Sequence, residues 1–210
     1  MVCITMHQNA SPPQAIILKR GQRYRRSRLP NADVELMPGV RWGNYEQLMT
    51  PAFWAVRAQI HQESVDAEGF RLGRTLREEV AACLLGGYGM GAELALAAFK
   101  RLQGEGVLTG TPSMRELEGL LSQPIQLSDK TVQYRFPRQK ARFLSCALLV
   151  IDELAHLKGV VLRNALLEIP GIGPKTASWI TRNWCGSDEV AILDVHICRA
   201  CEIAGGHSRS

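Results

Sequence analysis

The residues best suited to chemistry lie in one stretch, residues 166–199, which reads LLEIPGIGPKTASWITRNWCGSDEVAILDVHICR. Lys175 stands two positions after Gly173, and Asp194 follows it nineteen positions later. A lysine amine can act as a nucleophile in covalent catalysis. We expect Lys175 in the first turn of a helix, where the helix dipole disfavours a cation, so its position favours a functional role. The alternative is a solvated lysine that contacts phosphate as a point charge.

The residues before Lys175 predict two helices joined by a tight turn. Apolar residues recur at helical spacing up to Ile169, the Pro-Gly-Ile-Gly-Pro segment interrupts them, and the helical pattern resumes at Lys175. Pro174 suits the first position of the second helix. Backbone N–H groups of Gly171, Ile172 and Gly173, together with the helix start, would form a seat for a phosphate. An ordinary glycine turn between two helices is the alternative.

Asp194 follows the apolar run Val190-Ala191-Ile192-Leu193 and precedes another helical pattern that starts near Val195. An aspartate in this place is a good candidate for a helix N-cap. A capping carboxylate can also project into a cleft, so we expect either a cap alone or a cap that takes part in chemistry.

The whole stretch resembles the helix-hairpin-helix base-excision DNA glycosylases, and it is most similar to the 8-oxoguanine DNA glycosylase/lyases of the Ogg and shorter archaeal types. The shared motif is the glycine hairpin, the lysine two positions after its last glycine, the aspartate about twenty positions on, and the Asp-x-His run at Asp194 to His196. A weaker similarity extends back through the aromatic and basic segment Tyr134-Arg135-Phe136-Pro137-Arg138-Gln139-Lys140-Ala141.

This resemblance implies an all-α fold of the helix-hairpin-helix glycosylase (HhH-GPD) type, with the motif at about residues 160–184. It also implies removal of 8-oxoguanine from double-stranded DNA after the damaged nucleotide is flipped out of the duplex. Lys175 would attack C1′ and form a Schiff base, β-elimination would nick the strand, and Asp194 would stabilise charge on the sugar and help deprotonate the lysine. Gly171, Ile172, Gly173 and Lys140 would contact DNA phosphates.

The length of the chain after Asp194 departs from the family pattern. Only 16 residues follow Asp194, whereas the family continues with further helices that close the base pocket. The chain therefore looks either truncated or unusually short, and C-terminal helices could be lacking. The alternatives to an 8-oxoguanine enzyme are a non-catalytic or truncated DNA-binding protein of this fold, or a glycosylase/lyase for another damaged base.

Positive charge gathers near the N-terminus. The net charge is +5, and residues 1–41 hold seven basic and two acidic residues. The Arg-rich segment from Lys19 to Arg28 predicts a flexible basic arm over residues 1–30 that touches phosphates, followed by a helical glycosylase-like domain over residues 31–210. A solvated tail is the alternative.

About eight helices with few or no strands are expected in the remaining chain. Thr50 with Pro51, and Thr75 with Glu78, predict two helix starts. The glycine run at 86–91 favours a helix–helix turn over a loop beside the base pocket. Residues 130–142 mix five basic residues, Lys140 among them, with two aromatic residues, a composition that can contact nucleic acid or form a solvent-exposed helix start.

The six cysteines do not follow a common zinc or iron–sulfur spacing. We therefore expect no metal site among the side chains and no iron–sulfur cluster. The resemblance implies that hairpin carbonyls can bind a monovalent cation. No apolar run is long enough to span a membrane and no signal peptide is evident, so we expect a cytoplasmic protein associated with the nucleoid. We also expect a monomer.

Overall fold

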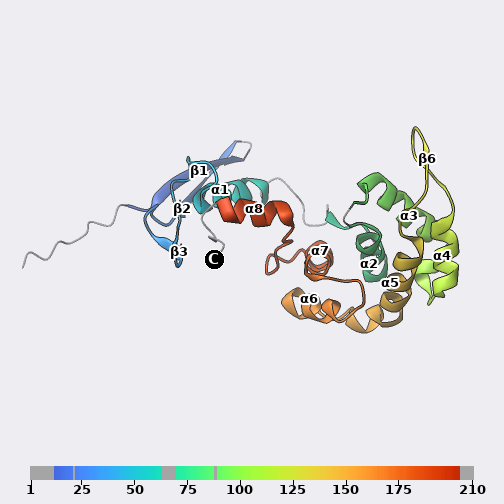
Figure 1. The fold of residues 1–210 in the computed structure, drawn as a ribbon. Helices are drawn as coiled ribbons and strands as arrows, with labels where there is room; N and C mark the ends of the chain where they lie inside the picture. Colours follow the sequence, from blue (N-terminus) through green and yellow to red (C-terminus); the bar gives the residue numbers. More distant parts are fainter. Residues whose placement is uncertain (1–11, 21, 63–69, 88, 204–210) are drawn as a thin grey trace, which may run out of the picture. The chain divides into compact units, whose positions relative to one another are not determined.

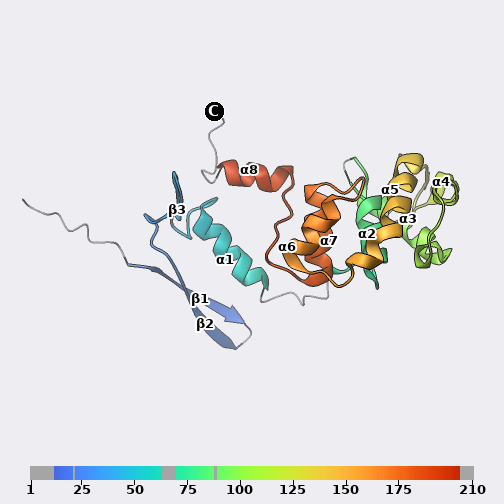
Figure 2. The same cartoon turned by 90° about the horizontal axis from the view of Figure 1, so that it is seen from below.

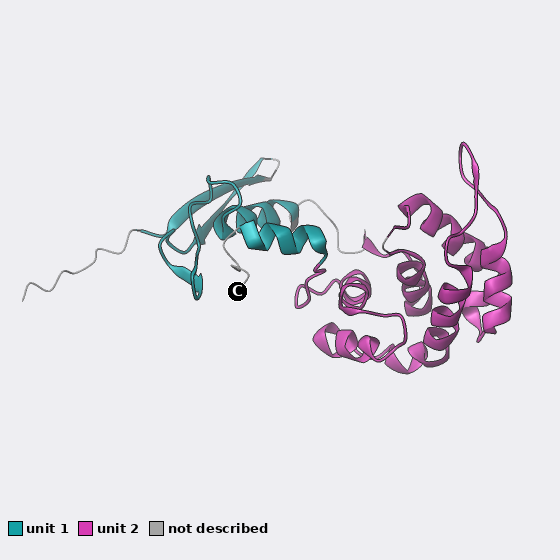
Figure 3. Cartoon of the chain, viewed as in Figure 1, with its two compact units in different colours: residues 1–66, 194–210 teal, residues 67–193 magenta. Residues whose placement is uncertain are grey.

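The computed structural model describes residues 12–20, 22–62, 70–87 and 89–203. The chain divides into two compact units, and each is described by itself (Figure 3). Unit 1 comprises residues 1–66 and 194–210, and unit 2 comprises residues 67–193. Eight α-helices occur in the described residues, in agreement with the helical class predicted from the sequence.

Unit 2 holds most of the helices. Its elements in chain order are α2 (Leu76–Leu85), α3 (Ala92–Gly104), the 3₁₀ helix η2 (Val107–Thr109), α4 (Met114–Ser122), β5 (Ile125–Gln126), β6 (Thr131–Val132), α5 (Pro137–Val150), the 3₁₀ helix η3 (Ile151–Leu154), α6 (Gly159–Leu167) and α7 (Pro174–Cys185). Helix α2 contacts α3, α5 and α7, while α4 packs on α5 and α6 on α7 (Figures 1 and 2).

A single hydrophobic core joins these helices. It consists mainly of leucine side chains that are almost fully buried, such as Leu84, Leu144 and Leu166, because α2, α5 and α6 each turn an apolar face inward. Helix α5 begins at Pro137 and gives way to η3 at Ile151.

Two predicted helix starts are confirmed by their hydrogen bonds. The Thr75 hydroxyl oxygen accepts from the Glu78 N–H at 3.2 Å, and the Glu78 carboxylate accepts from the Arg74 N–H at 2.7 Å. The Thr50 hydroxyl oxygen accepts from the Phe53 N–H at 3.1 Å, at the start of α1. These side chains satisfy amides that have no partner within the helix, and so they fix where each helix begins.

Unit 1 contains β1 (Gln14–Arg20), β2 (Arg23–Leu29), β3 (Glu35–Met37), β4 (Val40–Arg41), α1 (Pro51–Gln62) and α8 (Val195–Ile203). Strands β1 and β2 pair antiparallel, with Gln14 opposite Leu29 and Arg20 opposite Arg23. Ile16, Leu18 and Leu29 pack in a small core with Ala52 of α1.

The flexible arm expected over residues 1–30 is therefore wrong for residues 14–29. Burial alternates along β1, because Ile16 and Leu18 face α1 while Ile17 between them is exposed. The sequence does not show this alternation, since residues 15–18 are all apolar and the arginines dominate the composition of the segment. Residues 1–11 of the predicted arm lie outside the described residues, and the observed units divide the chain elsewhere than at residue 30.

Candidate nucleic-acid and catalytic site

The predicted helix-hairpin-helix motif is present in unit 2. Helix α6 ends at Leu167, the turn covers residues 168–173, and α7 begins at Pro174. The Ile172 N–H donates to the Ile169 carbonyl at 3.0 Å, which closes the turn. Both isoleucine side chains are buried, so the turn is fixed to the core of the unit.

Gly171 is the residue that the turn requires. Its φ is +90°, a left-handed conformation that residues with a Cβ rarely adopt. A Cβ at this position would also run into the ring of Phe143 from α5. The Phe143 ring therefore lies directly against the hairpin backbone. Gly173 differs, because it has an ordinary φ of −89° as the N-cap of α7 and no atoms near the position of an added Cβ.

The predicted phosphate seat needs one correction. The Ile172 amide is engaged with Ile169, so it is not an available donor for phosphate. Among the described residues of unit 2, the amides of Gly171 and Gly173 make no hydrogen bond to protein, and both residues are exposed. In the first turn of α7, Pro174 has no N–H, and the Ala177 N–H donates to the Gly173 carbonyl at 2.9 Å. Phosphate contact by this hairpin stays a prediction.

Lys175 lies where the sequence placed it, exposed in the first turn of α7 and directly after the turn. Ile172 and Ala177 on either side of it in the chain are buried, so the backbone that carries the lysine is anchored by packing on both sides. The lysine therefore extends from a fixed backbone rather than from a loop.

The far end of α7 is held by two contacts that the sequence did not reveal. The Arg71 guanidinium donates to the Trp184 carbonyl at 3.1 and 2.7 Å and lies 4.5 Å from the centroid of the Trp184 ring. The Asn183 side-chain amide donates to the Glu79 carboxylate at 2.9 Å. A carbonyl at a helix C-terminus has no partner within the helix, so the arginine satisfies it.

Glu79 is fully buried in α2. Besides Asn183, its carboxylate accepts from the N–H groups of Leu72 and Gly73 at 2.7 and 2.9 Å. Cys83 donates to it at 3.7 Å, and burial together with this carboxylate raises the pKa of the Cys83 thiol. Glu79 therefore ties the segment before α2 to α7, the helix that begins with Pro174 and Lys175.

Asp194 caps α8, as the sequence predicted. Its Oδ1 accepts from the His196 and Ile197 N–H groups at 2.9 and 3.0 Å, and its carbonyl accepts from the Cys198 N–H at 2.9 Å. Lys175 belongs to unit 2 and Asp194 to unit 1. After Asp194, the described residues contain one helix, α8.

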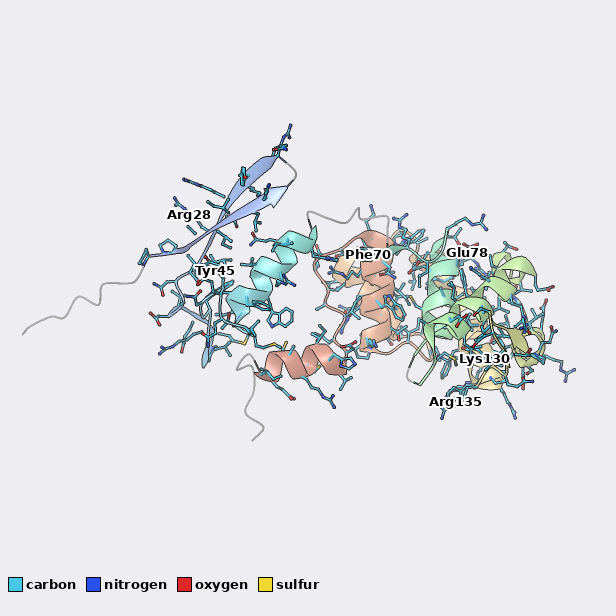
Figure 4. All side chains as sticks on the ribbon, turned by 90° about the horizontal axis from the view of Figure 1, so that it is seen from above. Arg28, Tyr45, Phe70, Glu78, Lys130 and Arg135 are labelled. Carbon is cyan, nitrogen blue, oxygen red and sulfur yellow. The ribbon has the colours of Figure 1, made fainter. Side chains whose placement is uncertain are left out.

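A pocket of about 730 Å³ lies at the start of α5, and the sequence had not indicated it. It is lined by Met114 of α4 and by residues 135–139, 142 and 143. The guanidinium of Arg135, labelled in Figure 4, lies 5.0 Å from the ring centroid of Phe136, and that of Arg142 lies 5.7 Å from the Phe143 ring. Since Phe143 also touches Gly171, this basic and aromatic pocket adjoins the hairpin.

Lys140 has a structural use that the sequence did not predict. Its ammonium group donates to the carbonyls of Leu84 and Gly86 at the end of α2, the latter at 2.7 Å, and burial lowers its pKa. Beside it, the Tyr134 hydroxyl donates to the Leu85 carbonyl at 2.6 Å, and burial raises the pKa of this tyrosine. An ammonium group has three N–H donors. Two of these donors serve the carbonyls of Leu84 and Gly86. A phosphate contact by Lys140 stays a prediction, and it would use the third N–H donor.

Residues 86–91 connect α2 to α3, with the Met90 N–H donating to the Gly87 carbonyl at 3.1 Å. The helix–helix turn favoured by the sequence is therefore confirmed, although Tyr88 within it lies outside the described residues.

The part of the chain that the structure describes contains no group of three His, Cys, Asp or Glu side chains placed to hold a metal ion. In the same residues, no helix is long and apolar enough to cross a membrane. The expected monovalent cation at the hairpin and the expected lack of an iron–sulfur cluster stay predictions.

Comparison with known proteins agrees with the sequence resemblance. Residues 68–205 match the family described as 8-oxoguanine DNA glycosylase, Ogg-HhH. This match covers more than half of the chain, so the chain belongs to that family, and the predicted helix-hairpin-helix glycosylase fold is confirmed.

Two relatives support the assignment. The "8-oxoguanine DNA glycosylase/AP lyase" of Metallosphaera sedula is 33% identical over 143 residues, which is 63% of this chain and 65% of that protein. The chain thus spans slightly less than two-thirds of the length of this curated relative. The crystal structure of the Methanocaldococcus jannaschii 8-oxoguanine DNA glycosylase matches 77% of each chain with a TM-score of 0.54 and 24% identity, which supports the fold.

Proposed function

We propose that this protein is a DNA repair enzyme that excises 8-oxoguanine from double-stranded DNA and then cleaves the strand at the abasic site. The observation that carries the proposal is the position of Lys175, exposed at the start of α7 and directly behind the glycine turn of the family's motif. The name of the Metallosphaera sedula relative, a glycosylase/AP lyase, supports the same two activities.

In the proposed reaction, the neutral amine of Lys175 attacks C1′ of the flipped-out nucleotide. The C1′–N bond to the damaged base breaks, and the base leaves with the bonding electron pair and a proton. The C1′–O4′ bond of the sugar ring then breaks, and the lysine nitrogen forms an imine with C1′. The two protons that the nitrogen loses end on the departing base and on O4′. Removal of a proton from C2′ then expels the 3′ phosphate by β-elimination, which nicks the strand.

Asp194 has the proposed role of the carboxylate that stabilises positive charge on the sugar and accepts a proton from Lys175. Gly171 and Gly173 have the proposed role of holding a phosphate next to the lesion through their amides. The arginines of the pocket at α5 place positive charge and aromatic surface beside that hairpin, a combination suited to nucleic acid.

Borohydride trapping tests this proposal, because borohydride reduces an imine to a stable covalent bond. The protein is incubated with a duplex that contains 8-oxoguanine, a duplex with an abasic site and an undamaged duplex. We expect covalent adducts with the first two and none with the third. Lys175→Gln should abolish both adducts.

Lys158→Gln is the matched control, because Lys158 is an exposed lysine at the N-cap of α6, the other helix of the motif. This variant should keep full adduct formation. An adduct on the abasic duplex alone would reduce the function to a lyase. No adduct on either damaged duplex, with duplex binding retained, would identify a non-catalytic DNA-binding protein instead.

A further inference from the structure

The hairpin of β1 and β2 has two different faces. Residues directly opposite one another in an antiparallel pair point to the same side. One side carries Ile16 and Leu18, which are buried against α1, while the other carries Ile17 and Lys19 of β1. Opposite these last two residues stand Arg26 and Tyr24 of β2, and Arg28 stands opposite Ala15. We call the side formed by Ala15, Ile17, Lys19, Tyr24, Arg26 and Arg28 the outer face.

The outer face is exposed and positively charged. All six of its residues are exposed, and the side chains of Ile17 and Tyr24 retain 62% and 68% of their accessible surface. The Lys19 ammonium lies 5.9 Å from the centroid of the Tyr24 ring. Arg28 is labelled on the hairpin in Figure 4. No acidic residue precedes Asp33 in the sequence, so the hairpin itself holds no carboxylate to neutralise these cations.

The inner face gives the outer face a fixed shape. Ile16 and Leu18 retain only 6% of their surface, and they pack with Leu29 and Ala52. The Gln14 side-chain amide donates to the Pro30 and Gly43 carbonyls at 2.8 and 2.9 Å, and its oxygen accepts from the Tyr45 N–H at 2.9 Å. Cations held on a folded surface lose less conformational freedom on binding than cations on a flexible arm.

We propose that the outer face of the β1–β2 hairpin is a second DNA-binding surface, which contacts the phosphate backbone of double-stranded DNA through Arg26, Arg28 and Lys19. The proposal rests on the proposed function for the choice of DNA as the polyanion. It lies outside residues 68–205, the part that matches the glycosylase family. Guanidinium groups suit this task because they form bidentate hydrogen bonds with phosphate. Such contacts add affinity without reading sequence.

The experiment compares two double variants of β2 that change the net charge equally. Arg26→Thr with Arg28→Thr removes two cations from the outer face. Arg23→Thr with Arg25→Thr removes two cations from the opposite side of the same strand. Threonine retains a high propensity for strands. Dissociation constants for an undamaged duplex are measured by fluorescence anisotropy from 50 to 200 mM KCl, and circular dichroism confirms folding.

Each lost phosphate contact lowers the slope of log affinity against log salt by about 0.9. The outer-face variant should therefore lower the slope by about 2, so that its loss of affinity is about tenfold greater at 50 mM than at 200 mM KCl. The control should stay within about 0.5 of the wild-type slope. An unchanged slope in the outer-face variant overturns the proposal, and so does an equal decrease in both variants.

Two further measurements separate this surface from the proposed function and from other partners. Borohydride trapping at saturating protein should be the same for wild type and the outer-face variant. If wild type forms no adduct but the difference in salt slope remains, the enzymatic proposal fails and the surface stands. Binding of wild type and the outer-face variant to phosphatidylserine vesicles and to single-stranded RNA is also measured. If the outer-face substitutions weaken either of these interactions and leave duplex binding unaffected, DNA is rejected as the ligand.

Discussion

At the scale of single residues, the two glycines of the hairpin differ in whether the structure has room for a larger side chain. Gly171 combines a φ of +90° with the Phe143 ring where a Cβ would be, whereas Gly173 has an ordinary φ and open space. We expect Gly171→Ala to lower the free energy of unfolding by about 3 kcal/mol, from the left-handed backbone and the overpacking together. Chemical denaturation monitored by circular dichroism measures this change.

Gly173→Ala is the control for this prediction, and it should lower the free energy of unfolding by no more than about 1 kcal/mol, because alanine is a poorer helix N-cap than glycine. Equal stability of the two variants would contradict the packing of Phe143 on Gly171. Since a Cβ near the predicted phosphate seat can still hinder a ligand, DNA binding by Gly173→Ala reports on that seat without a folding defect.

Asp194 combines a confirmed structural role with a proposed chemical one, and two substitutions separate them. Asparagine caps helices as well as aspartate does but carries no charge. Asp194→Asn should therefore keep the stability of wild type and lower the rate of adduct formation about 100-fold or more, a typical contribution of acid–base catalysis. If Asp194→Asn forms adducts at the wild-type rate, the role of Asp194 is limited to capping α8.

Asp194→Ala serves as the comparison, because alanine removes both the charge and the cap. It should lower the free energy of unfolding by about 1 kcal/mol through loss of the hydrogen bonds from His196 and Ile197. Its trapping rate should fall at least as far as that of the asparagine variant.

The helices of unit 2 are linked by polar contacts as well as by the leucine core. Glu79 accepts hydrogen bonds from the segment before α2 and from Asn183 of α7, in a fully buried position. Glu79→Ala leaves the buried N–H of Gly73 and the buried side-chain amide of Asn183 without this acceptor, and we expect a loss of about 3 kcal/mol or more of unfolding free energy. Urea denaturation is the measurement.

Glu153→Ala is the matched control, because Glu153 is an exposed glutamate in η3. Its effect should stay within about 0.5 kcal/mol. If Glu79→Ala proved no more destabilising than Glu153→Ala, the link between α2 and α7 would contribute little to the stability of the unit.

At the scale of the whole molecule, the spacing of the cysteines bears on which cofactors the protein holds. The sequence leads us to propose a protein without an iron–sulfur cluster, since the spacing of its cysteines fits no common iron–sulfur pattern. Adduct formation should therefore survive prolonged EDTA treatment and dialysis unchanged, and the purified protein should show no visible absorption. A loss of adduct that added metal restores would reject this prediction.

Local patterns in the sequence determined much of the molecule. The caps at Thr50, Thr75 and Asp194, the turn at Gly171 and the exposed start of α7 all depend on residues close together in the chain. Short-range hydrogen bonds and backbone conformations follow from nearby residue types, so these features were predictable. The helical glycosylase fold followed from the same stretch through its resemblance to a family.

Tertiary structure decided the features that join distant residues. Three features depend on segments far apart in the chain: the packing of the β1–β2 hairpin on α1, the buried carboxylate of Glu79 and the use of Lys140 as a partner for carbonyls of α2. Composition alone assigned Lys19 to Arg28 to an arm, because charge is visible in a sequence whereas the packing of Ile16 and Leu18 on α1 is not. Burial on one face of a strand is what separates a folded basic surface from a flexible basic tail.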